Sequence, residues 1–236
     1  EKVLEAAPKY LDRNLLETPA LALDRVRMEI GRMAERVLPM LRKGTEAAIG
    51  GTARDLLELT RMDSQVGQLH GPILEYLREL SRQDLTSQEA ELVHRYLAIA
   101  GYYENIGDTL KINLVHIGQK RLRGEVIIGD QTRKLFEQLL DELIALLELA
   151  TRAVTRWDKE AARKVIRAKS RINQLSLGIE HHITRRMAAD APRRRLTYQI
   201  ETELLENLKR VYYFTKRISK IALENDLNTG ESSAAA

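Results

Sequence analysis

The stretch that decides the fold is residues 18–40, which read TPALALDRVRMEIGRMAERVLPM. Thr18 followed by Pro19 is a typical helix start, because threonine caps helix N-termini and proline fits the first helical turn. After Pro19, apolar residues recur at steps of three and four, which is the period of one face of an α-helix. They are Leu23, Val26, Ile30, Met33, Val37 and Met40. We therefore predict a long helix with one buried face, closed by Gly44 and the Gly50-Gly51 pair.

The same periodicity predicts five further helices. Four of them cover about residues 52–81, 87–118, 130–157 and 158–191, and a sixth helix of the chain follows and ends before Asn225. The third opens at a capping box of Thr86 and Glu89, and the second should kink at Gly71-Pro72. Trp157 closes the inward stripe of the fourth, as a plug at the end of the bundle. Ala191-Pro192 ends the fifth, because proline disfavours helix in the residue before it. The apolar run 126–128 is interpreted as a plug packed under the junction of the two halves.

The two sets of three helices have similar lengths and order. We therefore predict an all-α fold made of a tandem pair of antiparallel three-helix bundles, produced by an internal duplication. Asp63 and Glu104 are 41 residues apart in the first set, and Lys169 and Lys209 are 40 apart in the second. The predicted divisions are a leader segment 1–17, a first repeat 18–118, a second repeat 119–229 and a disordered or tag-derived tail 230–236.

Composition limits the possible functions. Cysteine is absent, which excludes disulfides, thiolate catalysis and cysteine-ligated iron–sulfur clusters and fits a reducing compartment. The longest uncharged stretches, such as 96–103, are far shorter than the roughly 18 apolar residues of a membrane helix. Residues 1–110 contain 14 Lys+Arg against 18 Asp+Glu, and residues 111–236 contain 24 against 16. The basic second half suits phosphate groups, acidic lipids or an acidic partner, or is a solvated helix face.

Glu104 and Asp108 are the strongest candidates for a site. Four residues apart on a helix, their carboxylates stack on one side, and counting from the apolar stripe places them away from the core. Oxygen ligands of this kind suit Mg, Ca, Mn and iron. Asp63 on the neighbouring helix could supply a third ligand. The alternative is an ordinary solvated acidic face.

The segment Tyr103-Glu104-Asn105-Ile106-Gly107-Asp108 resembles the Glu-x-x-x-Asp helix motif of PhoU proteins, usually written Glu-Arg-Ile-Gly-Asp. The opening residues 8–12 and 18–23, leading into 29–33, resemble the start of the PhoU-like domain that follows the membrane region in bacterial sodium/phosphate cotransporters. The resemblance covers most of residues 8–225. It implies a cytoplasmic, duplicated three-helix fold without catalytic activity, tied to phosphate uptake, that in some members carries iron or another metal such as manganese on these motifs.

The second half departs from this pattern. In the sixth helix the acidic positions of the motif become Lys209 and Tyr213, and Lys169 stands where Asp63 stood. A cation site cannot be transferred there. Lys169, Arg171, Lys209 and Arg210 would instead form a basic surface for an anion or an acidic partner.

Two rival functions remain weaker. A ferritin-like di-metal oxidase uses two Glu-x-x-His motifs, and only Glu91 with His94 fits, so we expect no enzyme. The adjacent His181 and His182 are interpreted as packing at the end of the fifth helix. The run Arg193-Arg194-Arg195 is not accompanied by a nucleic-acid recognition motif, so we expect no nucleic-acid partner.

The sequence thus predicts a regulatory domain on the cytoplasmic side of the inner membrane. Its expected partner is the transmembrane region of a sodium-dependent phosphate transporter in the same polypeptide, and it could also form a homo-oligomer. The absence of an initiator Met before Glu1 agrees with a domain of a longer protein. The alternative is a free-standing PhoU-type regulator that binds a transporter or a sensor kinase.

Overall fold

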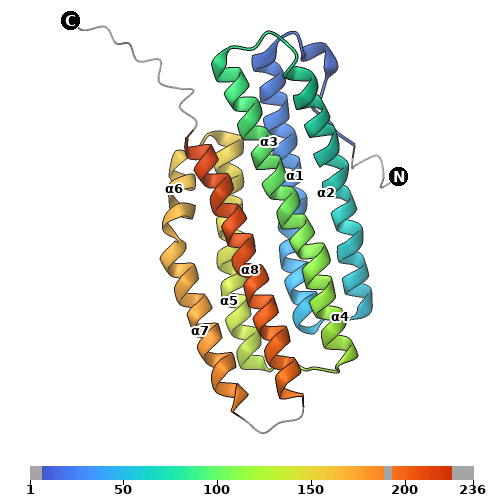
Figure 1. Cartoon of the computed structure of the whole chain (residues 1–236), viewed down its shortest axis with the longest axis vertical. Helices are drawn as coiled ribbons and strands as arrows, with labels where there is room; N and C mark the ends of the chain where they lie inside the picture. The colour runs from blue at the N-terminus through green and yellow to red at the C-terminus, as the bar shows by residue number, and fades with distance from the viewer. Residues whose placement is uncertain (1–6, 189–192, 225–236) are drawn as a thin grey trace, which may run out of the picture.

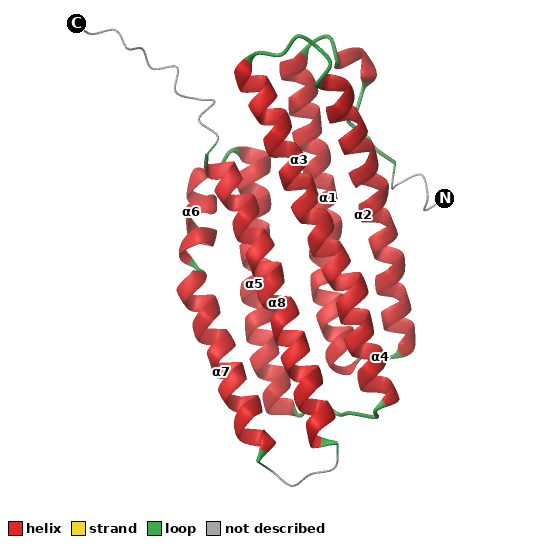
Figure 2. Ribbon diagram, in the orientation of Figure 1, coloured by secondary structure: helices red, strands yellow, loops and turns green. Residues whose placement is uncertain are grey.

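The computed structural model describes residues 7–188 and 193–224. Within these ranges every regular element is a helix and none is a strand (Figure 2). The all-α prediction is therefore confirmed. None of the helices in the same ranges is both long and apolar enough to cross a membrane.

The first set of helices consists of three long rods. They are α1 (Pro19–Gly50), α2 (Ala53–Leu80) and a composite rod of α3 (Ser87–Asp108), the π-helix η3 (Thr109–Leu114) and α4 (Val115–Arg123). The short 3-10 helix η2 (Arg13–Leu15) precedes α1. The third rod thus continues past Gly118, its predicted end. The π-helix inside the rod was not predicted either.

The second set has the same order but a broken middle rod. It contains α5 (Asp130–Arg156), α6 (Lys159–Arg167), α7 (Lys169–Met187) and α8 (Arg194–Leu223). The predicted fifth helix is divided at Ala168, although the buried residues Val165 and Ile172 continue the same stripe on either side. The predicted stops at 191–192 and 225–230, and the predicted tail, lie outside the described residues.

The two sets lie side by side with their long axes roughly aligned (Figure 1). Contact between them runs mainly along α1 with α5 and along α3 with α8.

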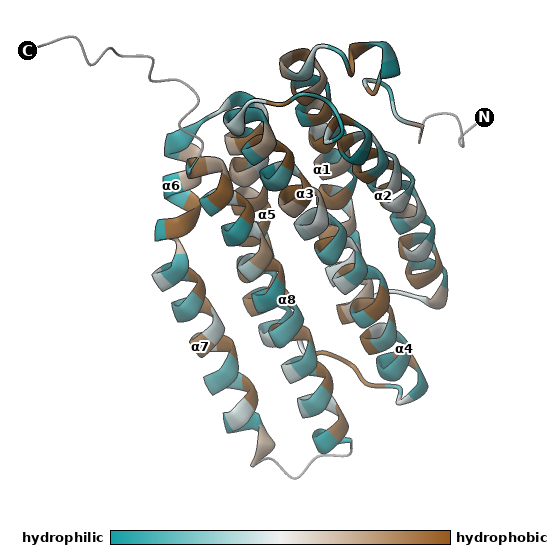
Figure 3. Ribbon diagram, turned by 45° about the horizontal axis from the view of Figure 1, so that its top comes forward, coloured by the Kyte–Doolittle hydropathy of each residue, from teal (hydrophilic) through white to brown (hydrophobic). Residues whose placement is uncertain are grey.

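Apolar residues line the inward side of the helices (Figure 3) and join into one continuous core. All six apolar positions predicted between Leu23 and Met40 are buried. Each such side chain stabilises the fold by ~1.5–3 kcal/mol relative to an exposed one. Whether the two sets superimpose as repeats stays a prediction.

Helix starts follow the expected capping chemistry. The capping box at α3 is confirmed, because the Glu89 N–H donates to the Thr86 hydroxyl at 3.2 Å and the Thr86 N–H donates to the Glu89 carboxylate at 2.9 Å. A second box, between Thr52 and Asp55, starts α2. Pro19 is the first residue of α1 as predicted, although the Thr18 side chain makes no capping bond.

Two apolar predictions need correction. Trp157 does not complete the inward stripe, because it caps α5 in the left-handed conformation (φ 57°) and is 40% exposed. Its ring lies beside Tyr96 and under the Arg27 guanidinium. In the run 126–128, Val126 and Ile128 are buried whereas Ile127 is 85% exposed, so only two of the three residues form the plug. Pro72 lies inside an uninterrupted α2, and the kink there stays a prediction.

Candidate functional site

The structure brings the three predicted acidic residues together between α2 and the α3–η3 rod. Asp63 lies on the core side of α2, between the buried residues Leu59 and Val66, and is itself only 5% exposed. Gly107 of α3 faces it, and a Cβ atom there would lie 3.2 Å from Asp63 Oδ1. A residue without a side chain at 107 thus lets the buried carboxylate approach α3. We call Asp63, Glu104 and Asp108 the carboxylate cluster.

Glu104 is more enclosed than the sequence predicted. Its side chain is 24% exposed, and Oε2 is buried without a hydrogen-bond partner in the described part of the chain. The prediction that it points away from the core was wrong in this respect, because α2 packs against that side of α3. Burial raises the pKa of Glu104, and the charges of Asp108 and Asp63 raise it further. The three carboxylates are therefore close enough to repel one another.

Two basic side chains adjoin the cluster. The Lys111 ammonium of η3 forms a salt bridge of 2.7 Å with Asp63 Oδ2. This bond and the charge of Asp63 raise the pKa of Lys111, and Asp108 and Glu104 add smaller contributions. His70 Nδ1 of α2 lies 3.9 Å from Glu104 Oε2, and burial lowers the pKa of His70.

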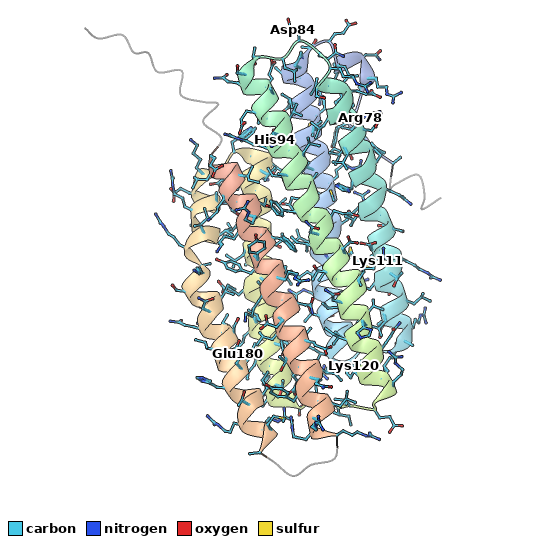
Figure 4. The ribbon with its side chains drawn as sticks, viewed as in Figure 1. Arg78, Asp84, His94, Lys111, Lys120 and Glu180 are labelled. Atoms are coloured by element: carbon cyan, nitrogen blue, oxygen red, sulfur yellow. The ribbon has the colours of Figure 1, made fainter. Side chains whose placement is uncertain are left out.

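Sequence reasoning missed Lys111, although a signal was present. Lys111 follows Asp108 by three residues and Glu104 by seven, so all three lie on one helix face. Figure 4 labels Lys111 on the composite rod, on the side that faces α2.

The chemistry of the cluster determines which ion it can hold. A divalent metal needs several oxygen ligands at about 2.0–2.6 Å. Among the described residues no group of three or more His, Asp or Glu side chains is arranged to hold a metal ion. Asp63, Glu104 and Asp108 would be the ligands if a metal bound, and this assignment stays a prediction.

The residues of the predicted basic surface differ in their surroundings. Lys209 forms salt bridges with Glu206 at 2.8 Å and Glu180 at 3.4 Å. Lys169 is the first residue of α7. Its charge contributes to lowering the pKa of Lys216, which lies two turns along α8 from Lys209. Arg210 lines a different feature, an open pocket of roughly 660 Å³ bordered by η3, α4 and α8. Arg171 is exposed on α7. The four residues thus have different neighbours, and a shared anion or partner site among them stays a prediction.

The residues of the rival functions lie elsewhere. Glu91 is salt-bridged to Arg95 on the outer side of α3, and His94 is exposed. This pair does not face the interior, as a di-metal oxidase would require. Of the two adjacent histidines, His182 packs as predicted, with Nε2 3.0 Å from the Thr132 hydroxyl, whereas His181 is exposed. Of the arginine run, Arg193 is salt-bridged to Glu125 and Arg194 lies against Glu201.

A buried acidic residue that sequence reasoning missed holds the segment before α1. Glu29 of α1 is completely buried, and its Oε2 accepts hydrogen bonds from the backbone N–H groups of Lys9 at 2.9 Å and Tyr10 at 2.8 Å. Arg32 binds the other oxygen and also donates to the Ala7 carbonyl. The opening motif is thereby fixed to the first bundle.

The fold resembles that of PhoU proteins, as two crystal structures show. PhoU from Pseudomonas aeruginosa superimposes with a TM-score of 0.76 at 17% identity, over 85% of this chain and 95% of that one. The phosphate transport system regulatory protein PhoU from Streptococcus pneumoniae gives 0.75 at 15% identity, over 90% and 98%.

The sequence comparisons agree. Residues 30–112 match the PhoU domain family, a region that extends from within α1 to η3 and includes the carboxylate cluster. A curated relative in Salmonella typhimurium, named "Putative inorganic phosphate export protein YjbB", is 25% identical over 204 residues, which are 86% of this chain and 37% of the relative. The protein of the same name in Escherichia coli is 25% identical over 179 residues, 75% of this chain and 33% of the relative. The chain thus spans about a third of the length of these relatives.

Proposed function

We propose that this chain is a regulatory domain of a sodium-dependent transporter of inorganic phosphate, and that it acts without catalysing a reaction. The observation that carries this proposal is the match, over most of the chain, to one part of longer relatives whose name assigns them to phosphate export. The matched PhoU domain supports a regulatory role within such a protein.

The proposed mechanism is a change in how the domain packs against a membrane-embedded transporter region of the same polypeptide, on the cytoplasmic side of the inner membrane. Glu29 supports this mechanism, because it fixes the segment before α1 to the bundle at two backbone positions. A movement of α1 would therefore pull on the chain that precedes it.

A free-standing PhoU regulator is the second candidate. It is favoured by the two crystal structures, of which this chain covers 95% and 98%. The native reading frame around Glu1 distinguishes the candidates. Several upstream segments of about 20 apolar residues each would favour the fused domain, and a start codon close to Glu1 would favour the free-standing regulator.

Phosphate flux tests the function itself. Cells without other phosphate transporters would express the complete protein, or a version that lacks residues 7–224, at equal abundance in the membrane. We expect the deletion to change the rate of radiolabelled phosphate movement, and measuring both uptake and release shows which direction the domain controls. Equal rates in both directions would contradict the proposal.

A further inference from the structure

The carboxylate cluster holds three acidic groups in a small, partly dry space. Asp63 Oδ1 and Glu104 Oε2 are both buried without hydrogen-bond partners in the described part of the chain. Buried carboxylate oxygens are costly unless a positive charge or a donor compensates them. The arrangement therefore requires a cation close to Asp63 and Glu104.

The chain supplies this cation from η3. The Lys111 ammonium lies 2.7 Å from Asp63 Oδ2, within the range of a charge-assisted hydrogen bond. Asp108 and Glu104 also attract it. His70 is a poorer source of charge, because it lies 3.9 Å from Glu104 and its burial favours the neutral ring.

The same ammonium opposes a metal ion. A divalent cation bound to Asp63 would lie within a few ångströms of the Lys111 charge, and the repulsion is strong in a partly buried site. Lys111 would have to leave Asp63 before a metal could bind there. The donor set of this chain therefore does not fit the metal that the resemblance to PhoU proteins implies.

We propose that Lys111 is the resident cation of the carboxylate cluster and replaces a metal ion there. It joins η3 to α2 by its bond to Asp63, and the first bundle is consequently independent of divalent metals. Gly107 contributes by leaving room for the Asp63 carboxylate next to α3. Without Lys111, the cluster would become a site for a divalent cation.

The first test is direct metal analysis of the unaltered protein. The chain would be dialysed against Mn²⁺ or, without oxygen, Fe²⁺, and bound metal measured by mass spectrometry. The melting temperature would be measured with the metal and with a chelator. We expect less than stoichiometric metal and no change in melting temperature. One tightly bound ion per chain that is lost in Glu104→Gln would overturn the proposal.

The second test removes the lysine. Lys111→Met should lower the melting temperature by several degrees, because Asp63 loses its partner. Added Mn²⁺ should restore much of this loss in the variant and leave the unaltered protein unchanged. Lys111→Gln, which keeps a donor of similar length, serves as a milder variant if the first folds poorly.

Lys120→Met is the matched control, because Lys120 belongs to the same composite rod (Figure 4) and pairs at 2.7 Å with Glu203, a carboxylate that is 42% exposed. It should show a smaller loss and no response to Mn²⁺. If Lys111→Met and Lys111→Gln are as stable as the unaltered protein, or if Mn²⁺ stabilises the control equally, Lys111 is not the resident cation.

Discussion

The buried carboxylate of Glu29 accepts the backbone N–H of Tyr10 at 2.8 Å, across nineteen positions of sequence. The acceptor belongs to α1, and the donor belongs to the segment before it. A second backbone donor, Lys9, shares the same oxygen. The first bundle thus includes the chain that leads into it, although that segment contributes no long helix.

Glu29→Gln should weaken this attachment. The amide keeps one acceptor but loses the charge that strengthens the bonds to Lys9, Tyr10 and Arg32, so we expect a loss of about 1–3 kcal/mol in the free energy of unfolding. Hydrogen exchange at the Lys9 and Tyr10 amides should become faster. Glu35→Gln is the control, because Glu35 is exposed on the same helix, and it should change stability by no more than about 0.5 kcal/mol. Unchanged amide exchange in Glu29→Gln would show that Glu29 does not hold the segment.

Arg121 stabilises the end of α1 from the third rod. Its side chain is buried, and Nε donates to the Ala48 carbonyl at 3.0 Å while Nη2 donates to the Gly51 carbonyl. These groups belong to the last turn of a helix, where carbonyls lack partners and a positive charge is favourable. Arg121→Met should therefore cost about 2–4 kcal/mol in urea denaturation. The exposed neighbour Arg123, changed to Met, should cost less than about 0.5 kcal/mol, and equal losses in the two variants would contradict this assignment.

His182 should make stability depend on pH. Burial lowers the pKa of His182 in the folded protein, and Arg186, Arg185 and Arg194 lower it further. The unfolded chain, with a His pKa near 6.5, therefore binds more protons below that pH than the folded chain does. The contribution of neutral His182 to the free energy of unfolding is fully present above pH ~6.5 and is lost as the pH falls below that value. The stability advantage of the unaltered protein over His182→Gln should shrink on acidification. Parallel stability curves for the two proteins from pH 8 to 5 would contradict the prediction.

Glu201 of α8 pairs with Arg186, one of the arginines that lower the pKa of His182. It is fully buried, with Arg186 at 3.1 Å and Arg194 at 3.7 Å. Burial raises the pKa of Glu201, which the two arginines oppose. The contribution of Glu201 to the pH dependence of stability therefore has the opposite sign from that of His182. Because Glu201 is present in both the unaltered protein and His182→Gln, the difference between the two proteins reports on the histidine alone.

The sequence was sufficient for the fold because its long apolar stripes repeat with the helical period. Ile30, Met33 and Val37 were placed inward on that ground, and all three are buried. The break at Ala168 was missed because Val165 and Ile172 continue the stripe across it without a glycine or proline. Trp157 was misplaced because the immediate turn into α6 requires a left-handed residue, which directs the ring away from the stripe.

The site was predicted less completely than the fold. Helical spacing brought Glu104 and Asp108 to one face, and Asp63 to the facing helix, as the structure shows. The partner of Asp63 was not foreseen, since the pairing of Lys111 with α2 depends on how two helices pack. The roles of Glu29 and Glu201 were not predicted either. A single acidic residue inside an apolar stripe gives no periodic signal of its own.

A double-mutant cycle between Asp63 and Lys111 tests most directly the claim that the carboxylate cluster is held by an internal cation. The free energy of unfolding would be measured for the unaltered chain, Asp63→Asn, Lys111→Met and the double variant, all in the presence of a chelator. We predict that the double variant is more stable than the sum of the two single losses implies, by about 1 kcal/mol or more. Additive losses, within about 0.3–0.5 kcal/mol, would show that the two residues do not interact and would contradict the account.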